Sequence, residues 1–318
     1  LAQGLGILVT LITVIALERV GDLAVAISQA AKSVRPEGAV PEIQAMISRM
    51  SARAVSATVK YIQKANLEEL RSACGISSAR MSLVPLAAEV LNRLVNTFSP
   101  KDIALSSYGI REGMLYEQMP QRLRDRDPLI EACRFAEAKD ARMPGFGKVL
   151  NAFIMPLYKS APAPRKRLVK AACLLHDVSW RAHPDYRAEV CFDNATRANL
   201  GGLAHWERIY LGLALLHRYK SNRDGTGFNA ELLTLLPEAE VREAEILGRA
   251  MRFGAMFAVE KPVEHGNLFL RPKRHELVLT LTSTEGRDLF GEVAEARFNG
   301  LAQAMGCTPV IRTALSRR

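Results

Sequence analysis

The stretch SSYGIREG, residues 106–113, contains the residue types of a turn that could bind an oxyanion. An apolar triplet precedes it and is typical of a short buried strand. Glycine permits a positive φ or a close backbone approach, and Arg111 can hold an oxyanion through two N–H groups. Ligands of α/β proteins bind beyond the carboxyl ends of strands, so one interpretation is an oxyanion-binding site here. Its candidate residues are Ser106, Gly109, Arg111, Glu112 and Gly113.

The alternative for this stretch is a turn that only connects a strand to a helix. The two interpretations share one requirement for Gly113, which should have a positive φ or touch a neighbouring segment. We therefore expect Gly113→Val to damage the fold more than Ser106→Ala does.

A basic stretch between Ala161 and Arg187 suits a polyanion. It contains six Lys or Arg residues and two carboxylates, a local net charge of +4. A chain of anionic groups can contact several cations at once, even if each cation is only moderately well placed. Such binding weakens as the salt concentration rises. The alternative is a charged surface without a ligand. The candidate residues for binding such a polyanion are Arg165, Lys166, Arg167, Lys170 and Arg181.

Two pairs of residues have the spacing of metal ligands. His176 and Asp177 are adjacent, as in metallohydrolases in which a His, a His-Asp pair and a distant Asp hold the metal. The helix where the first His belongs contains none, so a metal-free scaffold with a buried imidazole is the alternative. Glu18 and Asp22 are four residues apart on one face of a predicted helix, where they form either half of a metal site or a solvated stripe.

The elements that must position these residues are mostly helices. Helical spacing of apolar residues predicts helices over 5–33 and 40–70, which would pair antiparallel. A helix over 87–98, a turn at Ser99-Pro100 and a strand over 102–107 follow. Helices are expected from 127 to 222, with a linker at 160–167. The end of the chain predicts a hairpin, 267–272 with 275–283, and a final helix over 286–306.

Composition excludes several classes of protein. The chain has 318 residues, of which 48% are hydrophobic and 24% charged, as in a folded protein of two to three domains. Its net charge of +10 favours a polyanionic partner. Five scattered cysteines predict neither a disulfide framework nor a zinc site, so we expect a reducing cytoplasm. The apolar run 4–17 is shorter than the roughly 20 residues of a membrane span.

Several motifs together resemble a known family. GISSARMSLVPLAAEVLNRLV and IALSSYGIREGMLYEQM look like the end of the actin-like module of the exopolyphosphatase / guanosine pentaphosphate phosphohydrolase family. AACLLHDVSWRAHPDYRAEV and GGLAHWERIYLGLALLHRYK resemble the helical domain that follows, so the resemblance covers about residues 72–318. It implies polyphosphate or a phosphorylated guanosine nucleotide as partner, Mg²⁺ in the intact enzyme, and no role for nucleic acid.

The family's catalytic loops are not found among these 318 residues. The resemblance implies an Asp-x-Gly-Ser-Asn-Ser loop, an acidic general base and an Asp-x-Gly-Gly-Gly-Ser loop, and the sequence has none of them. Phosphoryl transfer depends on such positioned amides, a metal and an oriented water. We expect the chain to bind polyphosphate without turning it over, as a fragment or a fusion.

The first 65 residues raise a second resemblance. LITVIALERVGDLAVAISQAAKSV and VPEIQAMISRMSARAVSATV look like two helices of a PhoU-type bundle, whose hallmark is Glu-Arg-hydrophobic-Gly-Asp. The predicted fold is therefore mainly α: a partial PhoU-like helical hairpin over 1–70, a remnant of an actin-like α/β module over 71–125, and an HD-like helical domain with a small β-hairpin over 126–318. The alternative function is a PhoU-like phosphate-signalling regulator, and a homodimer stays open.

Overall fold

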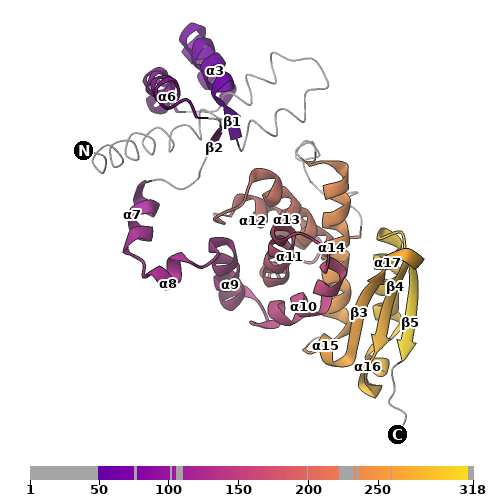
Figure 1. Cartoon of the computed structure of the whole chain (residues 1–318). Helices are drawn as coiled ribbons and strands as arrows, with labels where there is room; N and C mark the ends of the chain where they lie inside the picture. Colours follow the sequence, from indigo (N-terminus) through magenta and orange to yellow (C-terminus); the bar gives the residue numbers. More distant parts are fainter. Residues whose placement is uncertain are drawn as a thin grey trace. The chain divides into compact units, whose positions relative to one another are not determined.

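The computed structural model divides the chain into two compact units, with the boundary between Asp125 and Arg126 (Figure 1). The structure describes residues 49–313 except 75–76, 101, 105–109, 199, 222–232, 234–235 and 259. The predicted helices before residue 49, including the carboxylates of Glu18 and Asp22, lie outside the described residues. The same holds for Ser106 and Gly109.

The described part of the first unit is mainly helical and contains one short two-stranded ladder. Its elements are β1 (Arg49–Ser51), α3 (Ala52–Lys64), α4 (Leu67–Cys74), α5 (Ser78–Met81), α6 (Val84–Phe98), β2 (Asp102–Ala104), α7 (Ile110–Gln118) and α8 (Gln121–Arg124). β1 and β2 pair antiparallel, with Met50 opposite Ile103. α3 packs against α6, and the buried side chains of Val55, Val59 and Ala88 belong to their shared core. Removing this apolar surface from water is the main force that holds the unit together.

Two predictions for the first unit have different outcomes. The continuous helix expected up to residue 70 is wrong in its described part, because a strand occupies Arg49–Ser51 and the helix breaks after Lys64. At the break, Oδ1 of Asn66 accepts a hydrogen bond of 3.0 Å from the N–H of Glu68, which starts a new helix. The helix predicted to end at Phe98 is confirmed, since Ser99 has a φ of 44° and closes it.

The segment Arg111–Gly113 lies in a helix and not in a turn. The predicted strand is present as β2, but α7 begins at Ile110 and includes Gly113. Gly113 does not have a positive φ, and a Cβ built on it meets nothing within 4 Å. The expectation that this position requires glycine is therefore wrong, because a helical backbone with open space accepts a side chain.

The second unit is a helical group joined to a small sheet. Its elements are α9 (Pro128–Asp140), α10 (Phe146–Ile154), η1 (Met155–Tyr158), α11 (Ala163–Leu175), α12 (Arg187–Arg197), α13 (His205–His217), α14 (Glu238–Phe257), α15 (Pro262–His265), β3 (Gly266–Arg271), η3 (Pro272–Arg274), β4 (Glu276–Leu281), α16 (Thr284–Leu289), α17 (Glu292–Ala304) and β5 (Thr308–Thr313). α11 packs against α9, α10 and α13, and α14 packs against both α13 and α17 (Figure 1). Among the described helices, none combines the length and apolar character of a membrane span.

The linker predicted at 160–167 is shorter than expected, because α11 already begins at Ala163. Pro162 precedes the helix and Pro164 lies in its first turn. Proline is compatible with a first turn, where its missing N–H would have no helical partner. The basic residues at 165–167 are therefore held on a regular helix.

The sheet has the strand order β3-β4-β5. β3 and β4 form the predicted antiparallel hairpin, with Leu268 opposite Leu279. β5 pairs with β4 in parallel after the crossover through α16 and α17. The sequence analysis missed β5, whose residues are mostly exposed, so that no apolar alternation marks it.

Candidate functional site

Asp127 links the start of α9 to α11. Its Oδ1 accepts hydrogen bonds from the N–H groups of Leu129 (3.0 Å) and Ile130 (3.5 Å) and so caps α9. The same carboxylate accepts hydrogen bonds from Nε and Nη2 of Arg167, at 2.5 and 2.9 Å. The hydrogen bond from Arg167 is the main reason why the pKa of Asp127 is lowered. This pair fixes the spacing between two helices that border a pocket.

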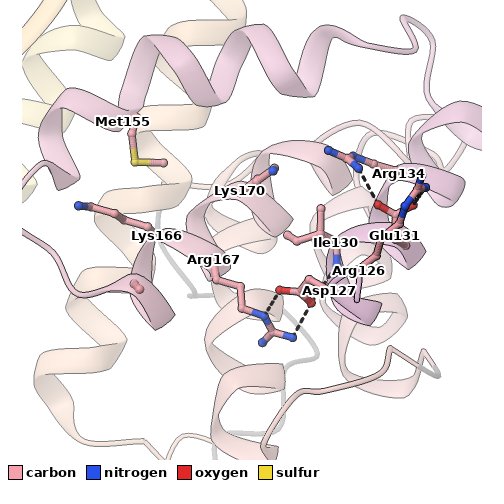
Figure 2. A pocket seen from close by; sticks show the side chains of 10 residues that line it. Arg126, Asp127, Ile130, Glu131, Arg134, Met155, Lys166, Arg167 and Lys170 are labelled. Atoms are coloured by element: carbon pink, nitrogen blue, oxygen red, sulfur yellow. Dashed lines mark hydrogen bonds and ion pairs between the residues drawn. The ribbon is translucent and has the colours of Figure 1, made fainter. Parts of the chain in front are cut away.

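The pocket between α9 and α11 has a volume of about 480 Å³ and is called the basic pocket below. Five of its ten lining side chains are cationic, and two are carboxylates (Figure 2). The lining residues are Arg126, Asp127, Ile130, Glu131, Arg134, Met155, Ala163, Lys166, Arg167 and Lys170.

The arginines of the basic pocket are engaged by its carboxylates. The carboxylate of Glu131 accepts hydrogen bonds from Nη1 of Arg126 at 3.1 Å and from Nη1 of Arg134 at 2.6 Å. Arg167, already paired with Asp127, also donates to the backbone oxygen of Gly202 at 2.9 Å. Dashed lines in Figure 2 join these arginines to their carboxylates. Three guanidinium groups thus face two carboxylates, and most of their charge is balanced locally.

The two lysines of the basic pocket differ from these arginines. Lys166 and Lys170 are one turn apart on the same face of α11. Within the described part of the chain neither has an ion-pair partner. The apolar side chains of Ile130 and Met155 line the same pocket. Two ammonium groups are therefore left to attract an anion into a hollow whose other charges are largely paired.

The remaining predicted cations lie elsewhere. Arg165 pairs with Glu240 and lies over the ring of Tyr210 at 4.3 Å, and only 14% of its side chain is exposed. Arg181 is exposed, lies over the ring of Trp180 at 4.8 Å, and its Nη1 is 3.9 Å from Oδ1 of Asp140. The basic stretch predicted as one surface is thus divided, and only Lys166, Lys170 and Arg167 line the pocket.

His176 and Asp177 belong to a separate buried group, called the His–Asp network below. Nε and Nη2 of Arg142 donate to the Asp177 carboxylate at 2.8 and 2.6 Å, and the backbone N–H of Arg142 adds a bond of 3.3 Å. The hydroxyl of Tyr219 donates to the backbone oxygen of His176 at 3.0 Å and lies 3.3 Å from Oδ1 of Asp177. Nδ1 of His176 is 2.9 Å from the oxygen of Cys173, and its ring contacts Phe146.

Burial and the neighbouring arginines together determine the protonation of this network. Burial, followed by the charge of Arg218, lowers the pKa of His176 to about 4, so the imidazole is neutral near pH 7. Burial alone would raise the pKa of Asp177, but the hydrogen bonds and charge of Arg142 outweigh it and lower this pKa. The carboxylate is therefore ionised and fully occupied by donors.

The predicted metal site at His176 and Asp177 gains no support from this geometry. In the part of the chain that the structure describes, no three His, Cys, Asp or Glu side chains are grouped so as to hold a metal ion. Arg142 occupies the oxygens that a metal would need. The alternative interpretation was a buried imidazole that is hydrogen-bonded to the backbone. His176 has this arrangement, since its ring is buried and its Nδ1 lies 2.9 Å from the oxygen of Cys173.

Sequence reasoning identified three of the ten residues that line the basic pocket and missed the other seven. Arg126, Glu131, Arg134 and Met155 were not singled out, although Glu131 lies five residues after one arginine and three before the other. Such spacing is common on solvated helices and did not distinguish this one. The meeting of α9 with α11 depends on tertiary packing.

Comparison with known proteins places much of the second unit in a family. The family model described as "Exopolyphosphatase, C-terminal" matches residues 148–310. The match includes α11 with its two lysines and the adjacent His176 and Asp177. No curated protein matches the chain.

Proposed function

Because the chain belongs to the exopolyphosphatase family, we propose that its second unit binds the chain of inorganic polyphosphate in the basic pocket. The supporting observation is the pair Lys166 and Lys170, which have no ion-pair partner among the described residues and face one hollow. A polyanion with a regular charge spacing can contact both ammonium groups at once. Arg126, Arg134 and Arg167 would add contacts by sharing their donors with the ligand.

The pocket suits a phosphate chain better than a metal ion. The groups in it that have no ion-pair partner among the described residues are ammonium ions, whereas Mg²⁺ requires oxygen ligands and keeps several waters. The Mg²⁺ that the family resemblance implies does not fit this pocket, and the proposal gives it no role there. Phosphorylated guanosine nucleotides carry the same phosphate chemistry and form the second class of ligand to be tested.

The proposal is tested by titrating fluorescent long-chain polyphosphate at 50 and 200 mM salt. Wild-type affinity should fall about tenfold or more, because each phosphate contact releases counterions on binding. In the double variant Lys166→Gln/Lys170→Gln, affinity at the lower salt should fall about 10- to 100-fold and its salt dependence should weaken.

A matched control removes two charges from another surface of the same unit. Lys273 and Arg274 are exposed in η3 and are not part of the pocket. Lys273→Gln/Arg274→Gln should keep nearly wild-type affinity. Equal losses in the two double variants would mean that only net charge matters, and the proposed site would be wrong. Competition by guanosine pentaphosphate then shows whether the nucleotide uses the same pocket.

A further inference from the structure

The loop between α12 and α13 lies against both helices that border the basic pocket, through residues 200–204. The backbone oxygen of Gly202 accepts a hydrogen bond of 2.9 Å from Nη1 of Arg167 on α11. A Cβ built on Gly202 would lie 3.4 Å from Cγ of Pro128, the first residue of α9. Gly202 is not one of the residues that line the pocket. The loop can therefore influence the pocket walls without contacting a ligand.

The backbone at Gly202 requires glycine. Its φ is +65°, in the left-handed region, where a side chain is strained. A Cβ at this position would also lie 2.9 Å from Nη2 of Arg167, which is too close for a stable contact. Because the guanidinium is the end of a flexible side chain, an added methyl group would displace the guanidinium before it disturbed the backbone. Gly202 thus determines where Arg167 can lie.

The loop is held in place by α13. Nη1 and Nη2 of Arg208 donate to the backbone oxygens of Ala198 at 2.6 Å and of Leu200 at 2.7 Å, where the chain leaves α12. The N–H of Ala204 donates to Oε2 of Glu207 at 2.7 Å, where the chain enters α13. Both Arg208 and Glu207 belong to α13. Because it is anchored at both ends, the loop presents its carbonyl oxygen to the neighbouring helix at a fixed position.

This loop holds Arg167 against the carboxylate of Asp127. Nε and Nη2 of Arg167 donate to Asp127 at 2.5 and 2.9 Å, the pair that dashed lines mark in Figure 2, and Nη1 donates to Gly202. A guanidinium has five N–H groups, of which three are used here, so two remain for a ligand. Without Arg167, the charge of Asp127 would be unbalanced in the pocket and would repel a polyanion. The attraction of the pocket for phosphate therefore depends on the position of Arg167.

We propose that Gly202 is a positioning residue for polyphosphate binding, which acts through Arg167 to keep the charge of Asp127 balanced in the basic pocket. The inference rests on the proposed function, because it requires that the pocket binds polyphosphate. The loop orients the guanidinium before the ligand arrives, so the ligand does not lose affinity by ordering it. A segment that does not line the pocket thereby sets how strongly the pocket attracts a polyanion.

Alanine at two glycines with the same backbone conformation tests this role. Gly202→Ala and Gly306→Ala introduce similar strain, because φ is +65° at the first position and +66° at the second. A Cβ on Gly306 would lie at an ordinary 3.7 Å from Nη2 of Arg242, outside the pocket. Titration with fluorescent long-chain polyphosphate at about 50 mM salt should show a loss of affinity of about three- to tenfold in Gly202→Ala and wild-type affinity in Gly306→Ala. Equal affinities of the two variants would overturn the proposal.

A second variant shows whether Gly202 acts through Arg167. Arg167→Lys keeps the charge, but one ammonium cannot bind both oxygens of Asp127 and the oxygen of Gly202 in the same geometry, so affinity should fall by a similar factor. In Arg167→Lys/Gly202→Ala the second change should cost less than about twofold more, because the group that it displaces is already gone. Losses that multiply would show that the loop acts in another way and would overturn the positioning role.

Two further variants keep the test decisive. If Gly202→Ala does not fold, Arg208→Lys loosens the same loop without placing a side chain against Arg167, and it should lower affinity by about two- to threefold. Lys166→Gln/Lys170→Gln separates this inference from the proposed function. If the lysine variant loses affinity whereas the loop variants do not, the pocket binds polyphosphate and only the role of the loop is wrong. If the wild-type chain does not bind polyphosphate, the proposed function is wrong and the inference fails with it.

Discussion

The basic pocket and the His–Asp network use charged side chains in opposite ways. In the network, the donors of Arg142 satisfy the buried carboxylate of Asp177, and the neutral imidazole of His176 contacts backbone and a ring. In the pocket, the carboxylates pair with arginines, and Lys166 and Lys170 have no ion-pair partner in the described part of the chain. The network contains the His-Asp motif that is familiar from metallohydrolases. The pocket, however, contains the ammonium groups that are available to bind a ligand.

The difference shows that a motif must be judged by the partners of its atoms. A carboxylate with both oxygens occupied by a guanidinium stabilises the fold and has little capacity left for a metal. Ammonium groups without a partner have the opposite property, since they add little to the fold and retain their attraction for anions. The predictions below separate these two roles.

Removal of the carboxylate from the network should have the largest effect. In Asp177→Ala, Arg142 loses the nearly buried carboxylate to which its Nε, Nη2 and backbone N–H all donate, so the free energy of unfolding should fall by about 2–4 kcal/mol. Urea denaturation measures this change. Asp185, whose side chain is 77% exposed, provides the control, and Asp185→Ala should stay within about 0.5 kcal/mol of wild type. A wild-type midpoint for Asp177→Ala would remove the structural role assigned to the network.

Acid should weaken the network through His176. The pKa of this imidazole is about 4 in the folded chain, against an ordinary value of 6.5 in the unfolded chain, so the unfolded chain binds more protons between these values. Stability is thus fully present above pH 6.5 and falls as pH drops towards 4, by roughly 3 kcal/mol at most. The lowered pKa of Asp177 extends the loss to still lower pH.

Urea midpoints between pH 7.5 and 4 test this dependence. His176→Gln cannot titrate at this position and should give a flatter profile, although its stability at pH 7.5 is lower. His183→Gln replaces an exposed imidazole and should keep the wild-type slope. Parallel profiles for wild type and His176→Gln would show that other groups cause the acid sensitivity.

A smaller effect is expected from releasing charge inside the basic pocket. Glu131→Gln removes the carboxylate that binds Arg126 and Arg134, and both guanidinium groups then become available to phosphate. Polyphosphate affinity at low salt should increase about three- to tenfold, with a steeper salt dependence. Glu238→Gln, an exposed carboxylate at the start of α14, is the control for net charge. Equal increases in both variants would argue against a local role of the pocket.

The smallest expected signal is phosphate release. With Mg²⁺ and either polyphosphate or guanosine pentaphosphate, the 318-residue chain should stay at background in a malachite-green assay. Loss of one donor to a transferring phosphoryl group typically costs a factor of ~10²–10³, and the family's phosphate loops are not found in this sequence. Turnover that survives Arg111→Ala but disappears in His176→Ala would instead make the His–Asp network an active site.

Much of the local structure was predictable from the sequence. The helix ending at Phe98, the strand at β2 and the β3–β4 hairpin follow from apolar periodicity and turn residues, which act over a few neighbours. Exposed or mixed patterns were harder to interpret. The strand β5 has no alternation of apolar and polar residues by which it could be recognised. Gly113 was expected to need the conformational freedom of glycine, but its helical backbone and open surroundings do not require it.

The sequence alone also determined the family, the positive charge and the two lysines one turn apart. It did not determine which cations are free. That depends on Asp127 reaching Arg167 on α11, and on the distant Arg142 reaching Asp177. An ion pair requires two groups within a few ångströms of each other, and such distances between remote residues are set only when the helices pack.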